Sequence, residues 1–376
     1  MRTLSAAELV GCMVNSISHR EDEEEYLTFL RFTDRQIQVY EPNAQFHQMS
    51  LCSSGVYLTL DTNGDELSLS CKIAELNPIE LVQVKGDVTF GQILHTLGET
   101  LKNVIWAGGQ LDISQHFDLY IDDVYINSVS IGSGQLTFSL PNPEHEWVNV
   151  KIWFPLYKPL SVRQVSINGE WRNTSEKRPV LYAFGDSITQ GFVAGKPSFC
   201  YIAQLAELLG YNALNQGIGG AMFDPIILDG FENLAVPDLI TVAYGTNDWS
   251  GNPSYEKIKE QITLFFVRLH QLYPNVPTYV LTPIWRTDMD DIQASGTFTS
   301  ITQLICDIAG AYSPVQIIEG LKISPRNPAF YADGSLHPNI SGFSYMASRL
   351  FKAIKDSLPA SHNHLCNGLR ISVPIL

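Results

Sequence analysis

The second half of the chain alternates between short apolar runs and longer amphipathic segments, and this alternation constrains the fold more than any other feature. In the segment 254–273, apolar residues recur at spacings of three and four, which places them on one core-facing stripe of a helix. Repeated strand–helix units of this kind predict a parallel sheet covered by helices on both faces. The predicted strands are 180–184, 212–215, 238–244, 277–282 and 315–319, and the predicted helices are 199–209, 254–273, 297–310 and 341–356.

The first half of the chain has a different period. Apolar and polar residues alternate there in short runs that are separated by Gly, Asn and Pro. Period-two runs at short intervals predict an antiparallel, jelly-roll-like β-sandwich in which each sheet buries one face. The predicted strands are 67–73, 117–121, 135–140 and 148–154, and the segment 89–104 reads as one helix inserted into the β layer.

The length of the chain, 376 residues, exceeds one usual hydrophobic core and favours two domains. The change of period places the boundary in a polar stretch. We therefore predict a β-sandwich domain at 1–168, a linker at 169–179, an α/β domain at 180–358 and a C-terminal tail at 359–376.

Composition excludes several classes of partner. A hydrophobic content of 45% with 17% charged residues is typical of a globular protein. The net charge of −15 and the absence of Lys/Arg runs argue against binding to nucleic acid or anionic membranes. There is no signal-like start, no 18-residue apolar segment and no CxxC pair among the six cysteines, so we expect a cytoplasmic protein with reduced, buried thiols. The histidines lack metal-ligand spacing, and neither a metal nor another cofactor is expected.

Polar clusters follow the predicted strands of the second half. Ligands of open parallel sheets bind beyond the carboxyl ends of the strands, so clusters at these positions should converge on one rim. The clusters are "GDS" at 185–187, "NQGIGG" at 215–220, "GTND" at 245–248 and, before the last helix, "DGSLHPN" at 333–339.

These clusters contain the parts that acyl transfer through a hydroxyl requires: a nucleophile, a base and donors for an oxyanion. Ser187 is the candidate nucleophile, and His337 is the candidate base with Asp333 to orient its ring. The side-chain amide of Asn247 and the backbone N–H groups of Gly220 and Ser187 are the candidate oxyanion donors.

The four clusters, in this order, resemble the SGNH hydrolases, also called GDSL esterases, over about residues 180 to 358. The resemblance implies a flavodoxin-like fold for this part, with nucleophilic or oxyanion roles for Ser187, Gly220, Asn247 and His337. In that family two residues usually separate the acid from the histidine, whereas "DGSLH" separates Asp333 from His337 by three. Some members of the family, including carbohydrate deacetylases, carry a β-sandwich in front of the hydrolase.

The resemblance therefore predicts a serine esterase that removes acetyl or another short acyl group from a small-molecule or oligosaccharide ester. An acyltransferase using the same acyl-enzyme is the alternative, and a sugar-binding module with a relict catalytic domain is a third hypothesis. Trp249, Trp285 and Arg286 follow strands and either line the site or pack beside it. Asp186 and Asp248 flank candidate site residues, and we expect them to hold loops by hydrogen bonding.

Overall fold

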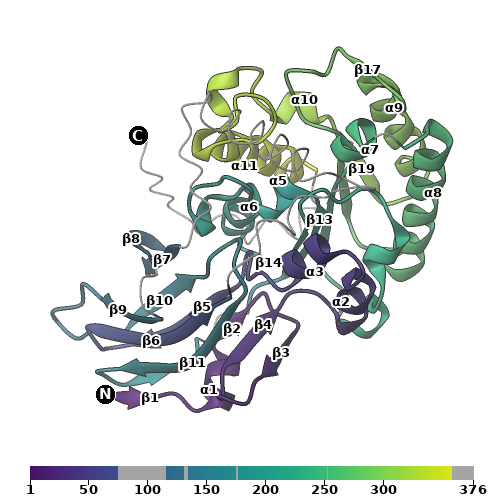
Figure 1. The fold of residues 1–376 in the computed structure, drawn as a ribbon. Coiled ribbons are helices and arrows are strands. Elements are labelled where there is room, and N and C mark those ends of the chain that lie inside the picture. Colours follow the sequence, from purple (N-terminus) through teal and green to yellow (C-terminus); the bar gives the residue numbers. More distant parts are fainter. Residues whose placement is uncertain (75–115, 131–133, 175–176, 252, 358–376) are drawn as a thin grey trace, which may run out of the picture.

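The computed structural model of the chain describes residues 1–74, 116–130, 134–174, 177–251 and 253–357. The predicted helix at 89–104 and the predicted tail at 359–376 lie outside the described residues. Figure 1 shows two antiparallel sheets built by the first half of the chain, and a parallel sheet with its helices built by the second half.

The parallel sheet confirms the prediction for the second half. Its strand order is β14-β13-β15-β16-β19, in which the first strand of the sheet lies between the second and the third, as in flavodoxin-like folds. Helices α6 and α11 contact each other, and α8 contacts α9, so the two pairs cover the sheet (Figure 1). The strands are β13 (Val180–Gly185), β14 (Asn212–Gly217), β15 (Leu239–Ala243), β16 (Thr278–Leu281) and β19 (Val315–Ile318); the helices are α6 (Tyr201–Leu209), α8 (Tyr255–Leu272), α9 (Phe298–Ala309) and α11 (Ile340–Lys355).

The first half forms the predicted sandwich, with one apolar core between its two sheets. Alternate residues of β6, such as Leu67 and Leu69, are buried in this core while their neighbours point outward. One sheet has the order β3-β4-β11-β6-β9 with β1 beside β11, and the other has the order β12-β5-β10-β7-β8 with β2 beside β5. The strands are β1 (Arg2–Thr3), β2 (Met13–Val14), β3 (Ser18–Glu21), β4 (Leu27–Leu30), β5 (Tyr57–Thr62), β6 (Glu66–Ile73), β7 (His116–Ile121), β8 (Val124–Ser130), β9 (Gln135–Ser139), β10 (Val148–Trp153), β11 (Leu160–Ile167) and β12 (Trp171–Arg172).

The prediction of one buried face per sheet is wrong for the second of these sheets. On β10, Ile152 faces the sandwich core, but Lys151 and Trp153 on the opposite face are buried as well. The reason is that this face packs against the α/β half, where the Lys151 ammonium lies 2.7 Å from a carboxylate oxygen of Glu207 on α6. The sandwich is therefore covered on one side by the second half of the chain.

Two short helices of the first half, α2 (Asp34–Tyr40) and α3 (Ala44–Ser50), lie beside the parallel sheet (Figure 1). Phe32, Ile37 and Leu156 belong to the same apolar core as the strands of that sheet. The sequence analysis did not predict these helices, although Thr33 and Gln36 form a capping box at the start of α2. Part of the predicted linker also has regular structure, because β12 pairs with β5.

Five of the six cysteines are described, and all five are free thiols, four of them buried as predicted.

The remaining elements are short. The other helices are α1 (Ala6–Gly11), α5 (Ser187–Gln190), α7 (Thr246–Ser250) and α10 (Gly320–Ile323), with 3₁₀ turns at Pro197–Phe199, Pro225–Leu228, Phe231–Asn233 and Pro328–Phe330, and a two-stranded ribbon of β17 (Ile292–Gln293) and β18 (Gly296–Thr297).

Candidate active site

Ser187 is the first residue of α5, and only Asp186 separates it from the carboxyl end of β13. The turn between strand and helix is tight, since a Cβ at Gly185 would lie 2.0 Å from Oγ1 of Thr189. Asp186 caps the helix, and its Oδ1 accepts a hydrogen bond of 2.9 Å from the backbone N–H of Ile188. The sequence therefore holds Ser187 at the rim of the sheet, with its side chain half-buried.

His337 lies within hydrogen-bond distance of this serine. Its Nε2 is 3.0 Å from Oγ of Ser187, across 150 residues of sequence. The ring of Phe192 packs edge-on against the imidazole, with ring centroids 4.7 Å apart. This contact restricts the rotation of the ring and excludes water from one of its faces.

Asp333 holds the other side of the imidazole. Its Oδ2 lies 2.7 Å from Nδ1 of His337, and its Oδ1 accepts three backbone N–H bonds, from Ser335, Leu336 and His337. Burial raises the pKa of Asp333, but the hydrogen bond to His337, the charge of that imidazole and the backbone donors outweigh burial and hold the pKa well below its ordinary value. The carboxyl is therefore ionised throughout the neutral pH range and accepts a hydrogen bond from Nδ1 of His337.

The glycine and asparagine clusters contact each other through a side-chain hydrogen bond. Nδ2 of Asn247 donates a hydrogen bond of 3.0 Å to the carbonyl of Ala221, the residue after Gly220. A primary amide carries two N–H groups, so one remains for a ligand. Gly220 is exposed and has a φ of +82°, a left-handed conformation that favours glycine.

Gly217 has a different role from the one its position suggests. Glycines in a loop beside a reactive site can let a substrate approach the backbone closely. A Cβ at Gly217 would instead lie 2.2 Å from the backbone nitrogen of Gln190. This glycine therefore lets β14 pack directly against α5.

Asp186 and Asp248 hold loops, as expected. The Oδ1 of Asp248 accepts a hydrogen bond of 3.1 Å from the backbone N–H of Phe223, which ties the asparagine loop to the glycine loop. Burial, opposed by backbone donors, raises the pKa of Asp186 to about 6 and that of Asp248 to about 7.

The three predicted lining residues are placed differently from one another. Trp249 is fully buried, its Nε1 donates to the carbonyl of Gly296, and Arg286 lies over its ring. Of the two interpretations of Trp249 and Arg286, the structure favours packing. Trp285 is partly buried against Tyr331, two residues before Asp333, and stays a candidate for lining the site.

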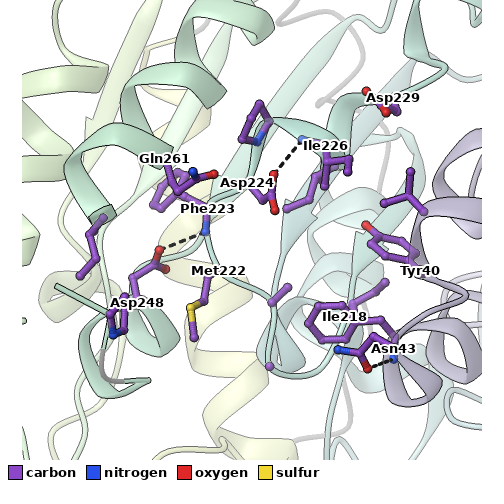
Figure 2. A pocket seen from close by; sticks show the side chains of 18 of the residues that line it. Tyr40, Asn43, Ile218, Met222, Phe223, Asp224, Ile226, Asp229, Asp248 and Gln261 are labelled. Atoms are coloured by element: carbon purple, nitrogen blue, oxygen red, sulfur yellow. Dashed lines mark hydrogen bonds between the residues drawn. The ribbon is translucent and has the colours of Figure 1, made fainter. Parts of the chain in front are cut away.

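A pocket of about 960 Å³ adjoins Gly220. Figure 2 shows that it lies between the two halves of the chain, with Tyr40 and Asn43 on one side and Asp224 and Gln261 on the other. The contribution of Tyr40 and Asn43 was not predicted from the sequence. The side chain of Asn43 caps α3 by accepting from the N–H of Phe46, so a capping signal was present in the sequence.

The described part of the chain contains no group of three or more His, Cys, Asp or Glu side chains placed to hold a metal ion. Within the same residues, no helix combines the length and the apolar character needed to span a bilayer.

Residues 183–343 match the GDSL-like lipase/acylhydrolase family. A comparison with curated protein sequences gives no match.

Solved structures share the fold over most of the chain. A salicylyl-acyltransferase from a tetracycline biosynthetic pathway superposes with a TM-score of 0.74 at 16% identity, covering 95% of this chain and 98% of that chain. A family two carbohydrate esterase from Clostridium thermocellum, in complex with cellohexaose, gives a TM-score of 0.58 at 16% identity, covering 81% and 93%. The acetyl xylan esterase of the rumen bacterium Butyrivibrio proteoclasticus gives 0.60 at 14% identity, covering 95% and 99%. At these identities the likeness concerns the fold.

Proposed function

We propose that this chain, in which residues 183–343 form a GDSL-like lipase/acylhydrolase domain, is a serine esterase that acts through an acyl-enzyme on Ser187. The observation that carries the proposal is the continuous path from Oγ of Ser187 to Nε2 of His337 and from Nδ1 of His337 to Oδ2 of Asp333, over 3.0 Å and 2.7 Å. Nucleophile, base and orienting carboxylate are thus all within hydrogen-bond distance.

In the first half of the reaction, His337 accepts the proton of Ser187 as Oγ attacks the ester carbonyl carbon. The carbonyl oxygen becomes an oxyanion, and we assign its stabilisation to the N–H groups of Gly220 and Ser187 and to the amide of Asn247. The C–O bond to the alcohol then breaks, His337 returns the proton to the leaving oxygen, and the acyl group stays on Ser187.

In the second half, water takes the place of the alcohol. His337 accepts a proton from the water, the resulting hydroxyl attacks the acyl-enzyme, and the proton returns to Oγ as the acid leaves. Asp333 accepts a hydrogen bond from Nδ1–H throughout both halves of the reaction. This bond keeps Nε2 directed at the oxygen with which it exchanges a proton.

We propose that the substrate is a carbohydrate that carries a short acyl group as an ester, with acetyl as the leading candidate. The pocket beside Gly220 is much larger than an acetyl group, so we assign it to the rest of the substrate. Its lining combines Tyr40 with hydrogen-bonding side chains such as Asn43, Asp224 and Gln261 (Figure 2), a mixture that suits a ring bearing several hydroxyl groups. A structurally similar esterase has been solved with cellohexaose, which supports testing this class of compound first.

The experiment is hydrolysis of p-nitrophenyl acetate and of acetylated oligosaccharides by the wild-type chain and by Ser187→Ala. We expect the variant to keep its melting temperature and to lose hydrolysis of both esters. Retention of more than a small residual rate would end the assignment of Ser187. Product analysis with added alcohols separates hydrolysis from acyl transfer, because a transferase yields a new ester in place of the free acid.

A further inference from the structure

Helix α3, from the first half of the chain, contacts the glycine loop that carries a candidate oxyanion donor. Nε2 of Gln45 donates a hydrogen bond of 3.3 Å to the carbonyl oxygen of Gly219. The ring of Phe46 covers the next residue, since its Cε1 lies 3.8 Å from the position of a Cβ on Gly220. The contact joins residues 174 positions apart in the sequence.

The other polar group of Gly219 is held by a second route that ends on the same helix. Its N–H donates to Oε1 of the buried Gln190 at 2.9 Å, and Nε2 of Gln190 donates to the sulfur of Met49 at 3.3 Å. Gln45 and Met49 are four residues apart, so they lie on one face of α3. Both backbone groups of Gly219 are therefore fixed by contacts that lead to this face.

The carbonyl of Gly219 and the N–H of Gly220 belong to one peptide group. In a planar trans peptide these two bonds point in opposite directions, so a partner that fixes the carbonyl also fixes the direction of the N–H. The loop lies beside the nucleophile, since a Cβ on Gly219 would be 3.9 Å from Cβ of Ser187. The bond from Gln45 thus sets where the N–H of Gly220 points.

A peptide between two glycines needs such a partner more than most. Glycine populates left- and right-handed conformations with similar ease, and neither Gly219 nor Gly220 has a side chain whose packing could hold the peptide plane. An oxyanion site is effective only if its donors are oriented before the charge develops.

The helix that supplies Gln45 is itself anchored to the end of β14. The buried guanidinium of Arg31 donates to the carbonyls of Asn215 and Gly217, at 2.7 Å and 2.8 Å, and to the carbonyl of Met49 on α3 at 2.9 Å. Helix and glycine loop therefore keep a fixed separation.

We propose that Gln45 is a positioning residue for the oxyanion donor at Gly220, so that the first half of the chain completes the reactive site of the second. The proposal rests on the proposed function. It assigns to α3 a role in the chemistry, in addition to its place beside the substrate pocket.

The test is the Gln45→Met variant, which keeps the length of the side chain and removes its donor. We expect kcat for p-nitrophenyl acetate to fall about tenfold, a fraction of the loss of a whole oxyanion donor, while KM stays within about twofold. The rate at which a fluorophosphonate labels Ser187 should fall in parallel, because that reagent also develops negative charge in the oxyanion site. The matched control is Gln38→Met on α2, an exposed glutamine, which should leave all three quantities unchanged.

Thermal unfolding separates positioning from a structural role. A residue that only stabilises the fold would lower the melting temperature and leave kcat of the folded enzyme unchanged, and that result overturns the proposal. Gln45→Glu provides a second variant, because its carboxylate faces the same carbonyl without a donor and should lower kcat at least as much.

The outcomes also distinguish this proposal from the one on which it rests. A wild-type chain that labels at Ser187, with variants that label at the wild-type rate, contradicts the role of Gln45 alone. A wild-type chain that neither hydrolyses esters nor labels at Ser187 contradicts both.

Discussion

Asp333 and His337 are joined by a hydrogen bond of 2.7 Å between Oδ2 and Nδ1, although three residues separate them. The other carboxylate oxygen accepts the backbone N–H groups of residues 335, 336 and 337, which bends the segment into a turn around the carboxylate. The turn absorbs the additional residue and brings the imidazole back to its acid. The spacing that departs from the family pattern is therefore compatible with the same side-chain contact.

Replacement of Asp333 by Asn tests this contact. The amide oxygen can still accept the three backbone N–H bonds, but the amide nitrogen then faces Nδ1 of His337 and favours the tautomer in which Nε2 carries the proton. We expect kcat to fall by about 10³–10⁴-fold, in line with the same change in a serine protease triad. Steady-state kinetics with p-nitrophenyl acetate measures the effect, and circular dichroism checks the fold. A loss smaller than tenfold would mean that another group orients the ring.

The buried carboxyl of Asp248 predicts a pH dependence of stability. Its pKa is about 7 in the folded chain and about 3.9 in an unfolded one, so between these values the unfolded chain releases a proton that the folded chain retains. The contribution of Asp248 to the free energy of unfolding therefore falls as the pH rises from about 4 to 7. Asp248→Asn keeps an acceptor for the N–H of Phe223 and does not titrate.

The free energy of unfolding of Asp248→Asn, relative to wild type, should thus increase between pH 4 and pH 7. Urea titrations of both chains at several pH values measure the difference, in which all other titrating groups largely cancel. A difference that is constant over this range would contradict the raised pKa.

Asn247→Ala tests the assigned side-chain oxyanion donor. We expect a fall in kcat of about 10²–10³-fold with KM little changed. The bond from Asn247 to Ala221 is also lost, at a cost of about 1 kcal/mol in stability, which the melting temperature would register. A change in kcat of less than threefold would show that Asn247 only holds the glycine loop.

The strands and helices of the second half could be predicted because each is a local pattern. The three polar clusters that follow strands could be placed on one rim because parallel strands end on the same side of a sheet. By contrast, Arg31, Gln45 and Phe192 carry no local signal, since each acts on a partner that only the tertiary fold brings near. Helix α2 could have been found from its capping box, whereas its position against the second half could not.

The same limit applies to burial. The alternation in β10 identifies the face toward the sandwich core, but Lys151 on the opposite face looks like a solvent-facing position until the second half is packed on it. Trp249 follows a strand of the predicted site, as a lining residue would, yet α7 turns its ring toward Phe298 in the interior.

The pocket assignment predicts a separation between small and large substrates. Gln261 lines the pocket from α8. Gln261→Ala should keep the wild-type rate on p-nitrophenyl acetate and raise KM for acetylated oligosaccharides by about fivefold or more, the loss of one hydrogen bond of about 1 kcal/mol. Gln271→Ala, an exposed glutamine on the same helix, is the control. Equal effects on both substrates would contradict the assignment of this pocket to the carbohydrate part of the substrate.

The most direct test of the account is the site at which a fluorophosphonate attaches, read by peptide mass spectrometry. We expect one adduct, on the peptide that contains Ser187, formed quickly in the wild-type chain, slowly in His337→Ala, and not at all in Ser187→Ala. An adduct on another residue, or equal labelling of the wild-type and Ser187→Ala chains, would contradict the claim that Ser187 is the nucleophile.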